Sequence, residues 1–146
     1  MNTVKRLVNC SNDNCTTDDQ YRDTPLVYAA KEGLVEVVQV LLEGGASVER
    51  SNANQQTALH TAALKGEEEV CRLLLDWGAK VNPLDKWKDT PLHHAAWKGS
   101  LTVVKLLVER GADVRVKNED GQTASEWARR WERKAVAEWL DSVSSG

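Results

Sequence analysis

Histidine, cysteine and aspartate are the residues of this sequence whose chemistry could ligate a metal or act on a substrate. Cys10 and Cys15 lie close together, but no second cysteine pair accompanies them, as a four-ligand zinc site would need. His93 and His94 follow Asp89, yet no nucleophile, base and orienting acid are indicated, and no glycine-rich phosphate loop is present. A lone histidine without a second ligand is a weak metal signal. We therefore predict no catalytic residue, no metal site and no cofactor.

Aromatic residues offer a different chemistry, which is contact with another macromolecule. The chain has 146 residues, with six tryptophans and no phenylalanine. An indole combines a large apolar surface with one N–H donor, and tryptophan is enriched at protein interfaces. Its functional meaning here depends on which positions of the fold the tryptophans occupy.

The elements that must position these residues recur along the chain. A ten-residue motif occurs three times at intervals of 33 residues, as TPLVYAAKEG (24–33), TALHTAALKG (57–66) and TPLHHAAWKG (90–99). A more divergent copy starts a further 33 residues on, at Thr123. In each unit the threonine caps an inner helix, paired alanines keep that helix thin, and a glycine ends it in the three complete copies. An outer helix with apolar residues at helical spacing follows.

The TPLHxAA string and its 33-residue period resemble the ankyrin repeat family over about residues 4–140. The resemblance implies an all-α ankyrin-repeat solenoid of stacked helix–turn–helix units with β-turn fingers. We predict a single domain with five parts and a tail. These are a partial N-terminal capping unit (1–18), full repeats (19–51, 52–84, 85–117), a C-terminal capping repeat (118–141) and a tail (142–146).

The segments 19–23, 52–56, 85–89 and 118–122 are where the family makes its fingers. The family pattern there has a glycine before the next threonine, but only Gly121 keeps it. Arg22, Gln55 and Lys88 replace it elsewhere, and Glu132 replaces the glycine between the last two helices. We expect the three finger residues Arg22, Gln55 and Lys88 to adopt a strained or altered backbone conformation.

The repeat register also predicts roles for other singular residues. Cys15 and Cys71 align with valines of the other units and are expected to pack as small apolar residues. Trp139 aligns with Val40 and is expected in the core. The resemblance implies that the motif histidines, His60 and His93, bond within their turn and orient the inner helix.

Partners of the family usually meet the inner helices, which form a concave face, and the tips of the fingers. We predict that Trp87, Trp97 and His94 form the centre of such a surface, because scaffold packing does not require their size. The predicted partner-binding residues are Tyr21, Tyr28, Lys31, Leu64, Lys86, Trp87, Asp89, His94, Trp97, Lys98, Trp127 and Arg130. Three alternatives stay open: Trp97 could stack on Arg130, Trp87 could pack on a neighbouring finger, and Trp127 could cover the end of the stack.

The sequence thus predicts a non-enzymatic scaffold that binds another protein or a peptide segment. The alternative is a structural segment of a larger ankyrin array, a spacer without a partner of its own. A net charge of −3 gives no reason to expect nucleic acid as a partner, and no signal points to a small molecule. Short apolar runs predict no membrane contact, and an odd cysteine number of three favours reduced thiols in the cytoplasm or nucleus.

Overall fold

A computed structural model of the chain describes residues 24–144. The predicted leading unit (1–18), Cys10, Cys15, Tyr21 and Arg22 lie outside these described residues. Within them, eight short helices follow one another. They are α2 (Pro25–Lys31), α3 (Val35–Glu43), α4 (Ala58–Lys65), α5 (Glu68–Asp76), α6 (Pro91–Lys98), α7 (Leu101–Glu109), α8 (Ala124–Arg130) and α9 (Lys134–Ser144).

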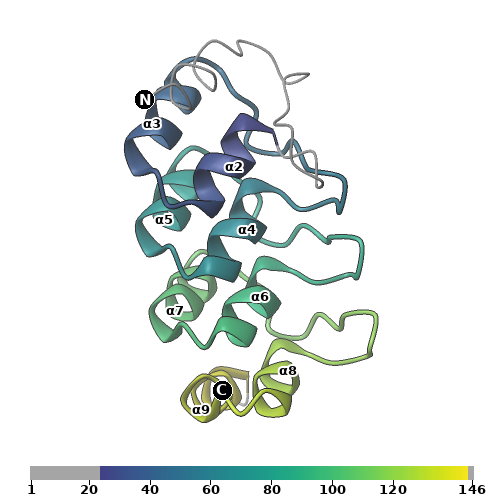
Figure 1. Cartoon of the computed structure of the whole chain (residues 1–146). Coiled ribbons are helices and arrows are strands. Elements are labelled where there is room, and N and C mark those ends of the chain that lie inside the picture. Colours follow the sequence, from purple (N-terminus) through teal and green to yellow (C-terminus); the bar gives the residue numbers. More distant parts are fainter. Residues whose placement is uncertain (1–23, 145–146) are drawn as a thin grey trace.

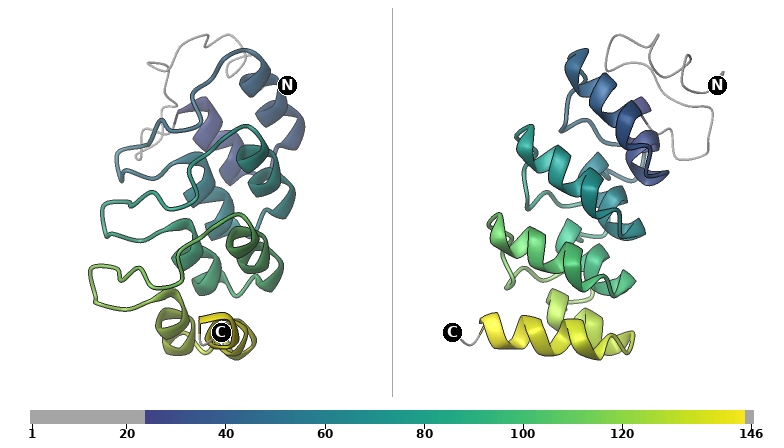
Figure 2. Two further views of the ribbon diagram at one scale, coloured as in Figure 1. Left: turned by 180° about the vertical axis from the view of Figure 1, so that it is seen from behind. Right: turned by 90° about the vertical axis from the view of Figure 1, so that its left-hand side faces the viewer.

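The helices form two parallel layers (Figure 1). The inner layer contains α2, α4, α6 and α8, and the outer layer contains α3, α5, α7 and α9. The loops that lead from each outer helix to the next inner helix all project to the same side. Seen from the side in Figure 2, the helix pairs stack as successive tiers. The prediction of an all-α solenoid of helix–turn–helix units is confirmed.

A threonine begins every inner helix of the described repeats. The Oγ1 atom of Thr57 accepts a hydrogen bond from the backbone N–H of His60, and the Thr57 N–H donates to Nδ1 of His60 at 3.1 Å. Thr90 and His93 repeat this reciprocal pair. The backbone N–H groups of the threonine and of the histidine are thus both hydrogen-bonded at the start of each helix. Because the histidine ring makes one of these bonds, it fixes the direction in which the chain enters the helix.

Small residues in the inner layer let neighbouring tiers approach closely. The paired alanines, such as Ala62 and Ala95, are fully buried, and valines of the outer layer pack against the same continuous core. Cys71 is fully buried too, as its register predicts. Trp139 packs against this core but stays partly exposed, with the Nζ atom of Lys105 5.9 Å from the centre of its ring. Trp139, which the repeat register places in the core, therefore lies at the edge of that core.

Three residues other than glycine adopt a left-handed backbone conformation in residues 24–144. Gln55 and Lys88 have φ angles of 61° and 63°, close to the 72° of Gly121 at the same place in the next finger. Glu132 has a φ of 61° where earlier units have a glycine. The prediction of a strained backbone is confirmed for Gln55 and Lys88, because side chains with a Cβ disfavour this region, and Glu132 shows the same conformation without a prediction for it.

None of the helices in the described part of the chain has the length and apolar character needed to span a bilayer.

Candidate partner-binding surface

Each finger is a tight turn built around one aspartate or asparagine side chain. Asp85 Oδ1 accepts hydrogen bonds from the backbone N–H groups of Trp87 at 3.0 Å and Asp89 at 2.9 Å. The backbone carbonyl of Asp85 accepts a third bond from the N–H of Lys88 at 2.9 Å. Asn52 and Asn118 hold the neighbouring fingers in the same way. Such side-chain-to-backbone bonds hold the turn in one conformation, so the tip residue has a defined place.

Adjacent fingers are also joined to one another. The N–H of Lys86 donates to the backbone carbonyl of Asn54 at 3.0 Å, and the N–H of Glu119 donates to that of Trp87 at 2.9 Å. Figure 1 shows these loops running side by side along one edge of the stack. The fingers therefore form one connected surface rather than independent loops.

The indole of Trp87 stands at a fingertip and remains 39% exposed. The Nζ atom of Lys86 lies 5.7 Å from the centre of its ring. Its backbone contacts the next finger, but its side chain keeps a substantial surface open to solvent. The alternative that the Trp87 side chain packs fully on a neighbouring finger therefore does not hold.

A second aromatic group lies at the C-terminal end of the inner layer. The ring of Trp131 meets the rings of Trp97 and Trp127 edge to face, with centroid distances of 6.4 and 5.9 Å. The guanidinium of Arg130 stands over Trp127 and Trp131, at 5.3 and 5.8 Å from their centres. The ring that meets Trp97 is thus that of Trp131, and Arg130 stacks on the last repeat instead.

A groove of about 640 Å³ brings several predicted residues together at the junction of fingers and concave face. Trp87, Leu64 and Lys31 all line it, with Leu64 half-buried. Tyr28 is half-buried nearby, with the Nζ atom of Lys31 5.7 Å from the centre of its ring. Further predicted residues with exposed side chains are Lys86, Lys98 and Arg130, and those half-buried are Trp97 and Trp127.

Two predicted contact residues are buried, which corrects their expected accessibility. The side chain of His94 does not project openly from the concave face, because its Nε2 atom lies 2.8 Å from Oδ2 of Asp85 beneath the finger. Asp89 is 8% exposed, and its Oδ1 accepts a hydrogen bond from Nδ2 of Asn118 at 2.9 Å. His94 therefore supports the surface from below, whereas Asp89 lies recessed between its own finger and the next one.

The side chains of His60, Asp85 and His94 gather closely enough to raise the question of a metal, with ligand atoms within 4.8 Å of one another. His60 is already fully bonded, however. Its Nδ1 accepts from the N–H of Thr57, so the ring proton is on Nε2, which donates to the carbonyl of Asp89 at 2.9 Å. With no lone pair left on His60, the group is a hydrogen-bond network and the residues do not fit a metal ion.

Burial dominates the acid–base properties of this network. Burial, together with the charge of His94, lowers the pKa of His60 to about 4. Burial alone raises the pKa of Asp85, but the hydrogen bond and charge of His94 outweigh it, so the pKa of Asp85 is lowered. The network consequently holds a neutral His60 next to an ionised Asp85 at neutral pH.

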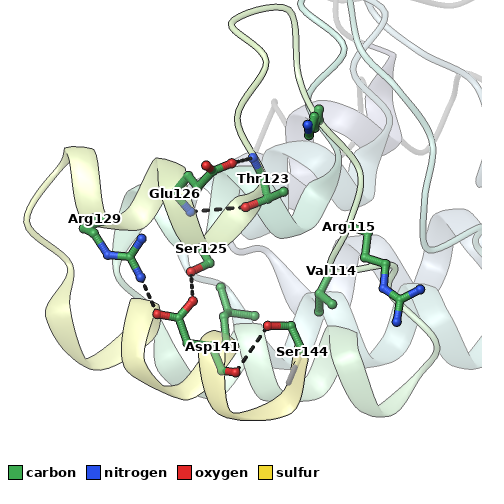
Figure 3. Close-up of a pocket in the computed structure, with 10 residues that line it drawn as sticks. Val114, Arg115, Thr123, Ser125, Glu126, Arg129, Asp141 and Ser144 are labelled. Carbon is green, nitrogen blue, oxygen red and sulfur yellow. Dashed lines mark hydrogen bonds and ion pairs between the residues drawn. The ribbon is translucent and has the colours of Figure 1, made fainter. Parts of the chain in front are cut away.

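The outward side of the last repeat has a separate cavity of about 370 Å³ (Figure 3). Its side chains are largely committed to one another. Asp141 accepts hydrogen bonds from Ser125 and Arg129, and Glu126 accepts one from the N–H of Thr123. These mutual bonds occupy polar groups that a ligand in this cavity would otherwise contact.

Sequence reasoning missed two features of the surface. Asp85 occupies the register of Asn52 and Asn118, so its role in the turn could have been inferred, but its pairing with His94 required the fold. The predicted contact set does not include Trp131, although its ring meets those of Trp97 and Trp127.

Comparison with known families agrees with the architecture. The family described as ankyrin repeats in three copies matches residues 1–85, and the one described as ankyrin repeats in many copies matches residues 74–128. No individual curated protein matches the sequence. Ankyrin repeats generally serve as protein-interaction scaffolds and are typically non-enzymatic. With the repeat motif, the tiers of paired helices and the matched residues in agreement, this chain belongs to the ankyrin repeat family.

Proposed function

We propose that the chain is a non-enzymatic scaffold that binds a protein or peptide segment on its concave face and fingers. The observation that carries this proposal is the position of Trp87. Its indole is partly exposed at the tip of a finger whose backbone is fixed by Asp85 and by the next finger. A large apolar ring on a preorganised support has little ordering entropy to lose on binding.

The expected energy is sufficient for a specific interaction. A tryptophan offers about 150–250 Å² of surface, and full burial corresponds to a gross gain of about 4–6 kcal/mol. Only part of this becomes binding free energy, because association and desolvation oppose it. Tryptophan anchors nevertheless often dominate interfaces, with truncation costing about 2 kcal/mol or more.

The groove beside Trp87 supports an extended contact rather than a single anchor. Leu64 and Lys31 on the inner helices line it together with Trp87 on the finger. A partner segment lying there would touch both the concave face and the fingers. Trp97 extends the same proposed surface toward the last repeat.

Affinity capture with the whole chain tests the proposal. Wild type, Trp87→Ala and the double variant Trp87→Ala/Trp97→Ala serve as baits, after circular dichroism shows that each is folded. Trp77→Ala is the matched control, because Trp77 is 44% exposed but lies at the end of outer helix α5. We expect a partner that is retained by the control and lost with Trp87→Ala.

A partner retained equally by all baits would show that the chosen surface is wrong. The spacer alternative predicts a different result, namely that wild type captures no partner above the level of an unrelated ankyrin stack.

A further inference from the structure

A second cavity, of about 270 Å³, lies between the finger that contains Trp87 and the next one. Its walls combine two indoles with three carboxylate residues. The lining residues are Trp87, Asp89, Asn118, Glu119, Asp120 and Trp127. Small-molecule pockets usually span about 300–1,000 Å³, so this space suits one side chain better than a metabolite.

Asp89 gives this cavity a buried acidic wall. Its Oδ1 accepts the hydrogen bond from Asn118, whereas no described residue donates to its Oδ2. Burial raises the pKa of Asp89, and the neighbouring charge of Asp85 adds to this effect against the opposing Asn118 bond. A carboxylate that is more than nine-tenths buried with an uncommitted oxygen is stabilised by a cation beside it.

The two indoles already show that they accommodate positive charge. Lys86 lies over the ring of Trp87 at 5.7 Å, and Arg130 lies over that of Trp127 at 5.3 Å. Arg130 also pairs with Asp120 at 3.5 Å, but both side chains are about half exposed. Such exposed pairs contribute about 0–1 kcal/mol, so they hold the cavity rim only weakly.

We propose that this cavity binds a lysine side chain of the partner protein, with its ammonium at Asp89 and its alkyl stem against Trp87 and Trp127. An ammonium is a compact charge with rotatable N–H donors that can pair with a single carboxylate oxygen, whereas the planar fork of an arginine pairs best with two. Since Asn118 already occupies Oδ1, Asp89 offers the arrangement that suits lysine. The inference rests on the proposed function, because it names the partner chemistry at the same surface.

The test uses the whole chain and a capped pentapeptide with lysine at its centre, flanked by serine and glycine. Two further peptides replace the lysine with norleucine, which keeps the alkyl stem without the charge, or with arginine. Binding is followed by NMR through the indole N–H signals, which Trp87→Phe and Trp127→Phe assign. The lysine peptide should shift these two signals saturably, about ten-fold more tightly than the norleucine peptide.

Three variants locate the effect. Asp89→Asn keeps an oxygen that can accept from Asn118 but removes the charge, and should weaken lysine-peptide binding to the norleucine level. Glu109→Gln removes an exposed carboxylate at the end of α7 and should leave the binding unchanged. Trp87→Ala changes an exposed fingertip and leaves the core intact. Because it removes one wall of the cavity, it should abolish the change that the lysine peptide causes in the indole N–H signal of Trp127.

Equal binding of the lysine and norleucine peptides, tighter binding of the arginine peptide, or unmoved indole signals would each overturn the inference. The affinity capture described above separates this failure from that of the proposed function. If Trp87→Ala still removes a captured partner while the lysine peptide does not bind, the cavity assignment is wrong and the surface stands.

Discussion

The imidazole of His94 and the carboxylate of Asp85 form a buried pair, with 2.8 Å between Nε2 and Oδ2. The side chain of Asp85 is fully buried, and that of His94 is 10% exposed. One carboxylate therefore serves two elements at once: its Oδ1 shapes the finger that presents Trp87, and its Oδ2 ties that finger to α6.

Asp85→Ala should be strongly destabilising, because it removes the turn bonds and leaves His94 buried without its partner. Breaking a buried pair from one side costs about 3–5 kcal/mol, and we expect a loss in this range in the free energy of unfolding by urea. Asp85→Asn is the control, since Asn52 and Asn118 occupy this position in the other fingers. A similar loss for both variants would contradict the role of the turn bonds.

Acidification from pH 7.5 to pH 5 should destabilise the fold. The pKa of His60 is about 4 in the folded chain against 6.5 as its ordinary value, so the unfolded chain binds a proton that the folded chain excludes. The free energy of unfolding is then constant above about pH 6.5 and falls between pH 6.5 and 4, by up to about 3 kcal/mol. Burial lowers the pKa of His93 as well, which adds to the loss.

Urea unfolding at several pH values measures this slope. Asp89 has the opposite effect on the stability of the fold as the pH falls. Because its pKa is raised in the folded chain, the folded chain takes up this proton at a higher pH than the unfolded chain does. Asp89→Asn should therefore steepen the loss toward acid, whereas His60→Ala should flatten it despite its lower stability. Identical slopes for His60→Ala and wild type would refute the assignment to His60.

Lys88→Gly should stabilise the chain. The φ of Lys88 is 63°, a region that costs a residue with a Cβ about 1–2 kcal/mol and glycine little. The greater freedom of glycine in the unfolded chain offsets part of this gain, so we expect a net increase of up to about 1 kcal/mol. Gly121→Lys, at the same place in the next finger, should have the reverse effect in thermal unfolding.

Cys71 should not react with iodoacetamide in the native state. Burial, together with the charges of Glu67 and Glu68, raises the pKa of its thiol to about 12. The thiolate, which is the reactive form, is therefore both scarce and covered. Mass spectrometry of the peptide that contains Cys71 should show labelling only after unfolding in guanidinium, and rapid native labelling would contradict this.

Much of the fold could be predicted because it is local. Thr57 with His60, the paired alanines and the closing glycines each act within one turn of chain, and their 33-residue recurrence reveals the stacking. The strain at Gln55 and Lys88 followed from comparing equivalent positions. Trp87 could be placed at a fingertip because the resemblance to ankyrin repeats assigns residues 85–89 to a finger.

The parts that escaped prediction depend on contacts between units. Whether His94 faces solvent or a carboxylate depends on how the finger 85–89 folds back over α6. The burial of Asp89 depends on Asn118, which belongs to the next repeat. The meeting of Trp97 with Trp131 similarly joins two repeats, and register within one repeat carries no information on such pairs.

The bond from His60 Nε2 to the carbonyl of Asp89 crosses from one tier to the next, as does that from His93 Nε2 to the carbonyl of Gln122. These two fingers are thus held in place by the tier before them, whereas the tier before the finger 52–56 has Val27 in place of the histidine. A single repeat moved into another ankyrin stack would keep its own fingertip residues. The orientation of its finger, however, would be set by the repeat that precedes it in the new stack. Exchange of whole 33-residue modules preserves the contact only where the preceding module supplies a histidine, so the order of modules, as well as their content, determines the shape of the recognition surface.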